Sequence, residues 1–361
     1  MTNAYASEGR VGRAIVASLA QVWGGCLPTG EIPMWRSDPL EPSGGRIIAS
    51  NNLASALVHD TLACFDPSDL EAEPRCLLAV SPRLRQGVVL CAQSVRHQIR
   101  RFLAWHESAR GAWCFYGRGS GLPGDSPTTA CAAVSLLAGS GPRRWSAARH
   151  DWIAAHQSAE GSFHTWLFGD RAEAARYGAA GYGSRDVEGQ PLLPSDRVFN
   201  AHILRFAYYY GMDRDARERL LTWLAAEASK DDTLGSVHHP KPLCFDHALA
   251  RALRASFPEV SREQLVDPLC ARILARRDAR GWFGGPLSTA LAVLALLDLG
   301  RGEVLGHETL IALCDSVLEP TRPQAPEPYL VGDLGSRPFN LAHVAAALAR
   351  LSVLVPAEAT G

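Results

Sequence analysis

The sequence has almost no excess of either charge. Its 361 residues include 36 Lys and Arg against 37 Asp and Glu, a formal net charge of -1. This balance creates no field that would attract nucleic acid or an anionic membrane surface, so we expect neither as a partner. No apolar run approaches the roughly 18 residues of a membrane span, so we expect no transmembrane segment.

Signals for export and for common cofactors are also missing. The first ten residues lack the basic and then apolar layout of a signal peptide. Nine scattered cysteines are typical of reduced thiols, and we expect a soluble cytoplasmic protein. There is no Walker loop, Rossmann glycine pattern, Gly-x-Ser-x-Gly elbow or paired Asp-rich magnesium motif. We therefore predict no cofactor.

What the sequence does contain is an internal repeat. Six segments share one order, in which a loop with glycine, proline or aromatic residues precedes an apolar helix that has alanine near its start. The aligned alanines are Ala56, Ala130, Ala201, Ala248, Ala290 and Ala342. The intervals leave room for one further helix each, and 3.6-residue periodicity places these helices at 10–23, 83–107, 143–157, 213–228, 261–277 and 305–318.

The two sets of helices differ in their apolar patterning. Those with the aligned alanines are apolar all round, as expected of helices buried on both faces, whereas several of the intervening ones are amphipathic. This alternation predicts an all-α fold, an (α/α)6 toroid of about twelve helices, as one domain over 1–361. We expect segments 37–46 and 319–328 to be irregular. The Gly-rich segment 171–194 is predicted to be a surface insertion, with a lid as the alternative.

Four of the loops carry a further signature. They read GEIPMWRS from Gly30, GAWCFYGRGSGLPGD from Gly111, QSAEGSFHTW from Gln157 and DARGWFGGPLSTA from Asp278. These loops resemble the Q-x-x-D/E-G-x-W repeats of the squalene–hopene cyclase and prenyltransferase superfamily, in register with the six repeats. The resemblance implies the same toroid. In such loops glycine permits a tight turn, and the aromatic side chain ties one helix end to the next.

Class II terpene cyclases of that superfamily carry an Asp-x-Asp-Asp-Thr-Ala motif at the start of an inner helix, and its middle Asp protonates an alkene or epoxide. The stretch resembling it here is Asp-Ser-Pro-Thr-Thr-Ala at 125–130. Asp125 matches the first Asp, but Pro127 stands in the place of the proton donor. Because proline cannot donate a proton, the motif is degenerate and the family mechanism does not carry over unchanged.

Other carboxylates could replace the missing donor. Asp196 lies five residues before its aligned alanine, as Asp125 does, and Asp246 lies two before. In a toroid the inner helices begin around one end of the cavity, so these three carboxylates can converge there. A histidine beside a carboxylate is the better acid–base near neutral pH, which makes Asp246 with His247 our preferred catalytic pair. The alternative for each Asp is a helix cap without chemistry.

The predicted function is non-redox cyclisation or isomerisation of a hydrophobic small molecule, namely a terpenoid, polyketide or prenylated intermediate, in the central cavity. Aromatic faces there would stabilise developing cations. The candidate substrate-binding residues are Trp113, Phe115, Tyr116, Phe163, Trp166, Asn200, His202, Phe245, Trp282 and Phe283. For most of the aromatic residues the alternative is packing between helices.

Two other functions stay open. A non-catalytic ligand-binding or accessory protein would keep the cavity without the donor. A zinc-dependent prenyltransferase-like enzyme would hold the metal through Cys244, Asp246 and His247, with His238 and His239 just upstream. That spacing packs the three ligands into one turn, where neighbouring side chains diverge, so we predict no metal site. No feature of the sequence predicts an oligomeric state.

Overall fold

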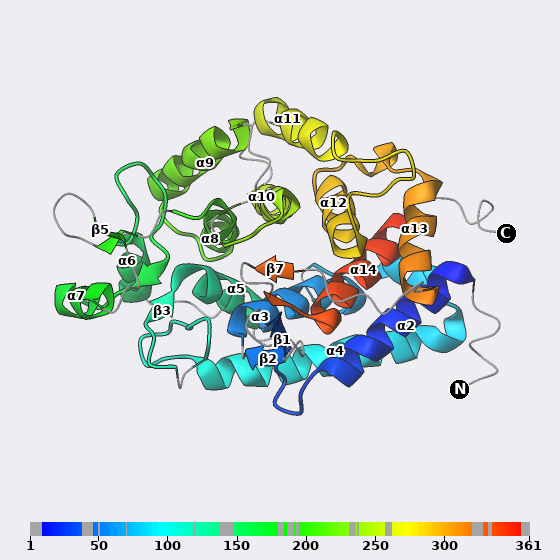
Figure 1. Cartoon of the computed structure of the whole chain (residues 1–361), viewed down its shortest axis with the longest axis horizontal. Coiled ribbons are helices and arrows are strands. Elements are labelled where there is room, and N and C mark those ends of the chain that lie inside the picture. The colour runs from blue at the N-terminus through cyan, green and yellow to red at the C-terminus, as the bar shows by residue number, and fades with distance from the viewer. Residues whose placement is uncertain are drawn as a thin grey trace.

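The structure is a computed structural model with helices as its main elements (Figure 1). It describes residues 9–37, 46–49, 51–69, 71–117, 120–137, 147–179, 184–185, 191–192, 195–230, 236, 238–256, 262–319, 328–330 and 334–354.

The inner ring consists of the helices that carry the aligned alanines. They are α3 (Asn52–Thr61), α5 (Ser126–Leu137), α8 (Arg197–Tyr209), α10 (Pro242–Ser256), α12 (Pro286–Asp298) and α14 (Arg337–Leu351). They pack on one another in chain order, and α14 packs on α3, which closes the ring. Every residue of α5 is buried, as its continuous apolar pattern predicts for a helix enclosed on both faces.

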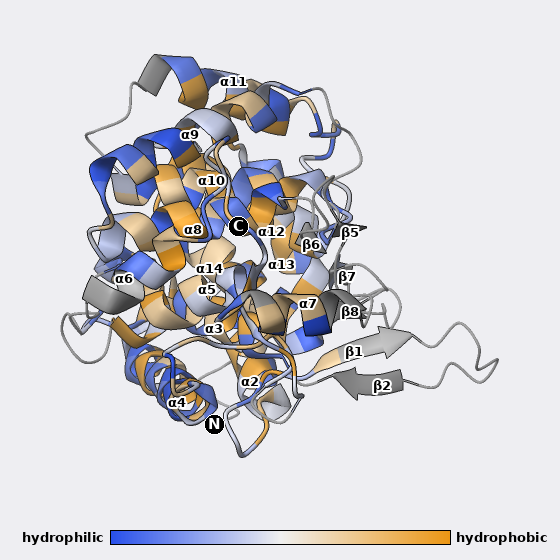
Figure 2. Ribbon diagram, turned by 90° about the vertical axis from the view of Figure 1, so that its left-hand side faces the viewer, coloured by the Kyte–Doolittle hydropathy of each residue, from blue (hydrophilic) through white to orange (hydrophobic). Residues whose placement is uncertain are grey.

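The outer ring consists of the intervening helices. They are α2 (Arg10–Gly25), α4 (Pro82–His106), α6 (Ala147–Ala154), α9 (Arg214–Ser229), α11 (Arg262–Leu274) and α13 (His307–Leu318). In α9 the buried residues are Ala216, Leu220 and Leu224, one stripe at the helical period. Figure 2 shows the contrast, with hydrophilic stretches on α9 and α11 and hydrophobic ones on α8. The predicted α/α toroid is confirmed.

Short strands are the feature that the all-α prediction did not include. β1 (Met34–Ser37), β2 (Arg46–Ala49), β7 (Pro328–Leu330) and β8 (Leu334–Gly335) form an antiparallel sheet in the order β2-β1-β8-β7. The ends of segment 37–46 are therefore paired, while 38–45 and 320–327 lie outside the described residues. Strands of two to four residues are too short to produce a readable alternating pattern.

Segment 171–194 also contains regular structure. Helix α7 (Arg171–Ala179) precedes β5 (Ser184–Arg185), which pairs with β6 (Pro191–Leu192). Figure 1 places α7 at the edge of the molecule, away from the ring centre. The remaining short pair is β3 (Gly124–Asp125) with β4 (Trp166–Leu167), and three 3-10 turns, η1 (Leu62–Phe65), η2 (Pro74–Ala79) and η3 (Gly302–Val304), complete the described elements.

The four signature loops each make the same hydrogen bond to an inner helix. Two residues after the loop glycine, a backbone N–H donates to the side chain that directly precedes the aligned alanine. The donor and acceptor pairs are Ile32 and Ser55 (3.0 Å), Trp113 and Thr129 (3.0 Å), Phe163 and Asn200 (2.6 Å), and Phe283 and Thr289 (3.1 Å). This recurrence shows that the sequence repeat is also a repeat of contacts.

Glycine is required in these loops for two reasons. Gly161 and Gly281 have φ of 100° and 83°, in the left-handed region that side chains disfavour. A Cβ at Gly161 would also lie 2.5 Å from the carbonyl oxygen of Arg219 in α9. The loops therefore press directly on the next outer helix, and they fix the two rings against each other.

None of the helices in the described part of the chain combines the length and the apolarity that crossing a bilayer requires.

Candidate functional site

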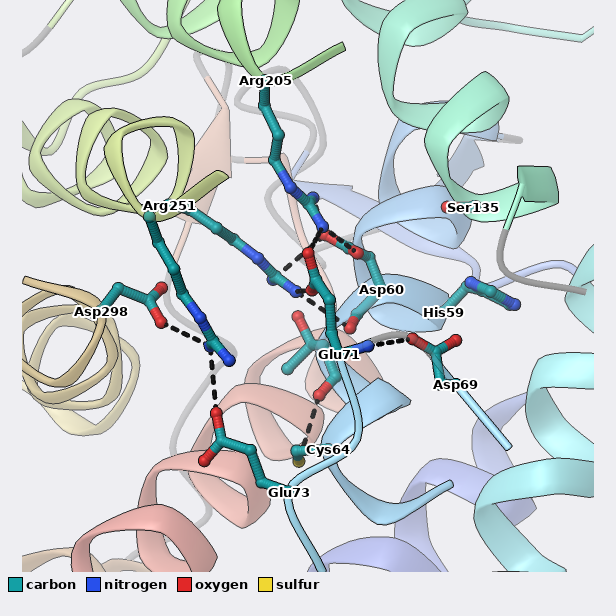
Figure 3. Close-up of polar contacts among 12 residues, drawn as sticks. His59, Asp60, Cys64, Asp69, Glu71, Glu73, Ser135, Arg205, Arg251 and Asp298 are labelled. Carbon is teal, nitrogen blue, oxygen red and sulfur yellow. Dashed lines mark hydrogen bonds and ion pairs between the residues drawn. The ribbon is translucent and has the colours of Figure 1, made fainter. Parts of the chain in front are cut away.

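Side chains from the C-terminal parts of α3, α8, α10, α12 and α14 meet in one place, which shows that these inner helices run parallel (Figure 3). We call this network the floor. It comprises Asp60, Glu71, Glu73, Asp298, Arg205, Arg251, Arg254 and Arg350. The opposite end of the ring, where the inner helices begin and β7 crosses the centre, we call the mouth (Figure 1).

The floor is a buried set of balanced charges. Arg251 bridges Asp60 (3.1 Å) and Glu71 (2.8 Å), and Arg205 binds the same two carboxylates. Burial alone would raise the pKa of Glu71, but Arg205 and Arg251 hold that pKa well below its ordinary value. Since four arginines face four carboxylates, the network is neutral and each charge is compensated.

The rest of the floor is built in the same way. Arg254 and Arg350 each contact both Glu73 and Asp298, at 2.8 to 3.0 Å. Two cavities of about 20 Å³ lie within the network, each with space for roughly one water molecule. The floor therefore closes this end of the ring with ionic groups that an apolar molecule would not cross.

Asp125 lies at the mouth, at the start of α5. Its Oδ1 accepts a hydrogen bond from the N–H of Thr128 at 2.7 Å. Its Oδ2 has no partner of good hydrogen-bond geometry among the described residues, although the Thr128 hydroxyl and the Phe115 N–H lie near enough to lower the pKa of Asp125 against the effect of burial. The side chain is 2% exposed, and burial raises the pKa of Asp125 to about 7. A carboxyl group in this state holds a proton for part of the time at neutral pH.

Asp196 has a similar position on α8 but different surroundings. Its Oδ1 accepts from the N–H groups of Val198 (2.8 Å) and Phe199 (3.1 Å). Its Oδ2 accepts from the Ser236 hydroxyl (2.7 Å) and the N–H of His238 (3.1 Å). Both oxygens are therefore engaged in local hydrogen bonds.

Asp246 is engaged towards the outer ring. It forms ion pairs with Arg272 of outer helix α11 and, at 3.6 Å, with Arg276 in the turn just after that helix. His247 instead lies beside His343 of α14, with 5.9 Å between ring centroids. Successive residues on a helix point about 100° apart, which sends Asp246 towards the outer ring and His247 towards the centre. The structure thus separates the pair that the sequence favoured.

Three histidines line the interior of the inner ring, namely His202 of α8, His247 and His343. Burial lowers the pKa of His202 to about 3 and that of His343 to about 4, so both are neutral at pH 7. His343 Nε2 lies 3.2 Å from the Thr61 hydroxyl. The Nε2 atoms of His202 and His247 have no partner within the described ranges.

Most of the aromatic candidates lie away from the centre. Trp113 is 1% exposed and donates from Nε1 to the Leu103 carbonyl of α4 at 2.7 Å, so it packs between the rings. Phe163 and Phe283 occupy the equivalent loop positions and are buried likewise. The centroid of the Phe245 ring lies 5.1 Å from the guanidinium carbon of Arg197 and 5.4 Å from that of Arg272.

The remaining candidates divide into three groups. Asn200 holds the Phe163 loop through hydrogen bonds and is a connector between the rings. Tyr116 is 45% exposed, and Phe115, Trp166 and Trp282 are partly buried. Of these ten candidates, we place His202 in the interior. After burial, the nearby His239, Arg205 and Arg251 further lower its pKa, so it lies close to these residues of the ring centre.

Tyr329 is a central residue that sequence reasoning missed. It lies on β7, which Figure 1 shows over the ring centre, and it is 2% exposed. Its ring lies 5.0 Å from that of His239 and 4.6 Å from that of Phe339, at the start of α14. Because β7 lies in a connection outside the repeats, no repeat position could have revealed it.

The three residues of the zinc alternative, Cys244, Asp246 and His247, are not gathered around one point. Asp246 is engaged with arginines while His247 turns towards the centre. Across the described ranges, no group of three or more His, Cys, Asp or Glu residues could hold a metal ion.

Known proteins resemble this chain in structure rather than in sequence. No protein-family model and no curated protein matches the sequence. A single-residue variant of the type II terpene cyclase MstE from Scytonema, solved with the substrate geranylgeranyl dihydroxybenzoate, matches with a TM-score of 0.62 and 15% identity, over 95% of this chain and 97% of that one. A protein from Actinoplanes matches with a TM-score of 0.60 and 16% identity, over 94% and 98%.

These matches extend along nearly the whole of each chain and agree with the double ring of helices. MstE has also been solved with its product, merosterolic acid A, at a TM-score of 0.62. The chain has the α/α-toroid fold of the class II terpene cyclases.

Proposed function

We propose that this protein is a non-redox cyclase or isomerase of a hydrophobic small molecule, and that Asp125 is its acid. The fold is similar to that of a type II terpene cyclase, and a ring of helices is suited to holding a flexible apolar chain in one conformation. MstE acts on a prenylated dihydroxybenzoate, so a prenylated aromatic acid is the first substrate class to test. Other terpenoids and polyketides belong to the same chemical range.

The state of Asp125 is the observation that carries this proposal. Its Oδ2 is buried and unpartnered among the described residues, and its pKa is about 7. An ordinary exposed Asp would be ionised at neutral pH and could not serve as an acid. After donating its proton, the carboxylate is stabilised by the Thr128 N–H at the start of α5. Asp125 thus combines a proton to give with a way to hold the resulting charge.

The reaction conserves atoms. The proton on Oδ2 of Asp125 adds to a substrate alkene, and the π electrons form the new C–H bond and leave a carbocation. A second alkene or aromatic ring of the substrate attacks the cation and closes a ring. Loss of a proton from a neighbouring carbon restores a double bond, so product and substrate are isomers. Solvent returns a proton to Asp125.

The surroundings of the mouth fit cationic intermediates. Phe199, Tyr329 and Phe339 lie close together there with His239. Aromatic faces attract positive charge without reacting with it, whereas water would capture a carbocation. The ionic floor at the other end excludes an apolar chain, which leaves the mouth as the route of access.

The test compares the Asp125→Asn and Asp246→Asn variants, introduced at the native gene in the organism of origin. Asparagine at 125 keeps an acceptor for the Thr128 N–H but has no acidic proton. We expect its extract to match that of a gene deletion by mass spectrometry, while the Asp246→Asn extract keeps the wild-type product. Purified proteins are also incubated with geranylgeranyl dihydroxybenzoate. Normal product from a folded Asp125→Asn variant would refute the acid assignment.

A second candidate function follows from Pro127. Proline in the first turn of α5 needs no hydrogen-bond partner for its nitrogen, so it suits the helix while removing the family's proton donor. A toroid of this kind could bind an apolar intermediate without converting it. In that case the deletion would alter product yield but not product structure, and Asp125→Asn would behave as wild type.

A further inference from the structure

A second acid–base arrangement lies at the mouth, beside the start of α8, the helix that packs against α5. It consists of Asp196, Ser236 and His239. The Ser236 hydroxyl donates to Asp196 Oδ2 at 2.7 Å, and His239 Nδ1 lies 3.3 Å from the same hydroxyl oxygen. His239 Nδ1 also lies 3.8 Å from Asp196 Oδ1. The three side chains form a chain from carboxylate to imidazole.

The direction of these hydrogen bonds fixes the tautomer of His239. The Ser236 hydroxyl gives its single proton to Asp196. Towards the imidazole, the Ser236 oxygen can therefore act only as a hydrogen-bond acceptor. Nδ1 must then carry the proton, and Nε2 carries a lone pair. Burial lowers the pKa of His239 to about 4, although Asp196 opposes this, so the ring is neutral at pH 7.

The free nitrogen of His239 faces a buried aromatic environment. The imidazole contacts Phe199 (5.3 Å) and Tyr329 (5.0 Å) edge to face, and it is 0% exposed. Its Nε2 has no hydrogen-bond partner within the described part of the chain. A buried imidazole with one nitrogen oriented and the other left open is arranged to exchange a proton with a bound molecule.

We propose that His239 is the base that ends the cyclisation, and that Ser236 and Asp196 position it. This inference rests on the proposed function. A C–H bond next to the last carbocation gives its proton to Nε2 of His239, and the electrons of that bond become the new double bond. The imidazolium formed is stabilised by Asp196 through Ser236. The proton then leaves to solvent, so no oxidant or reductant is needed.

His239 fits this role better than the other interior histidines. His343 already uses Nε2 towards Thr61. His202 and His247 have open Nε2 atoms, but in the described residues neither lies within 4.0 Å of a carboxylate, as His239 does. A nearby carboxylate matters because the imidazole becomes a buried cation after the proton transfer.

The first test needs no substrate. Histidine labelled with nitrogen-15 is incorporated into the whole chain, and the His239 signals are identified by their loss in His239→Gln. We expect the Nδ1–H tautomer at pH 7. Ser236→Ala should shift the population towards Nε2–H, whereas Ser236→Thr, which keeps the hydroxyl, should retain the wild-type tautomer. A wild-type His239 in the Nε2–H form would overturn the proposal.

The second test follows the product. In the native organism, His239→Gln should reduce the wild-type product by at least about 100-fold, the usual contribution of a positioned base. Cyclised products with a shifted double bond or an added water should replace it. Unchanged product from His239→Gln would overturn the role of His239 while leaving Asp125 in place. Unchanged product from Asp125→Asn would instead remove the proposed function itself.

Discussion

Asp125 and Asp196 cap neighbouring inner helices in the same way, but only Asp196 uses both of its oxygens. Asp196 accepts four hydrogen bonds, two of them from Ser236 and His238. Asp125 accepts one from Thr128, and its other oxygen is unpartnered in the described residues. Two positions that look equivalent in the repeat therefore hold a fixed carboxylate and an available one.

The pH dependence of the reaction should follow the protonation of Asp125. The acid form is needed, and the pKa of Asp125 is about 7. We expect kcat/KM to be constant between about pH 5 and 6 and to fall roughly tenfold per pH unit above 7. The measurement is a rate profile from pH 5 to 9 with the substrate found by extract comparison. A rate that rises between pH 7 and 9 would contradict the proposed acid, because Asp125 loses its proton over this range and His239 is already neutral.

The stability of the wild type should also depend on Asp125. Because the pKa of Asp125 in the folded state is raised from 3.8 to about 7, the native state binds more protons between these values. Stability then falls as pH rises from 4 to 7, by up to about 4 kcal/mol in total. Asp125→Asn removes this fall. The test is urea unfolding of both proteins at pH 4.5, 6 and 7.5. If the free energy of unfolding changes with pH equally in wild type and Asp125→Asn, burial does not shift the pKa of Asp125.

Replacing Asp246 should affect stability rather than chemistry. Asp246→Asn leaves Arg272 without its buried partner, and we expect a loss of about 3 kcal/mol in the free energy of unfolding with product formation retained. The control is Asp267→Asn, whose partner Arg301 is 43% exposed, and its effect should be much smaller. If Asp246→Asn is as stable as wild type but inactive, Asp246 has a role in the reaction.

The repeated loop contact should contribute to stability at each repeat. Thr289→Val keeps the shape of the side chain but leaves the Phe283 N–H without its acceptor in a buried place. We expect the free energy of unfolding to fall by about 1 to 2 kcal/mol. The control is Thr222→Val on the exposed side of α9, where the hydroxyl contacts only its own helix in the described structure. Equal effects in chemical denaturation would argue against a structural role for the loop contact.

The sequence was sufficient to predict the two rings, because burial on both faces and on one face leave different apolar patterns. It also located Asp125 and Asp196 through their distance from the aligned alanines. It could not show that Asp246 faces α11, since a helix position gives no rotation relative to its neighbours. Tyr329 was not predicted, and His239 was considered only beside a possible zinc site, for another reason. Both lie outside the inner helices, in connections whose path depends on tertiary contacts.

The ring is closed by the pairing of its earliest and latest helices, and this has a consequence for biosynthesis. α2 buries Ile15, Leu19 and Val22 and packs against α13 and α14, which are made about 300 residues later. At ribosomal speeds of about 5 to 20 residues per second, roughly 15 to 60 s pass between the synthesis of this apolar stripe and the synthesis of the helices that cover it. A nascent chain therefore remains an open arc, in need of protection from aggregation, until its last helix has left the ribosome.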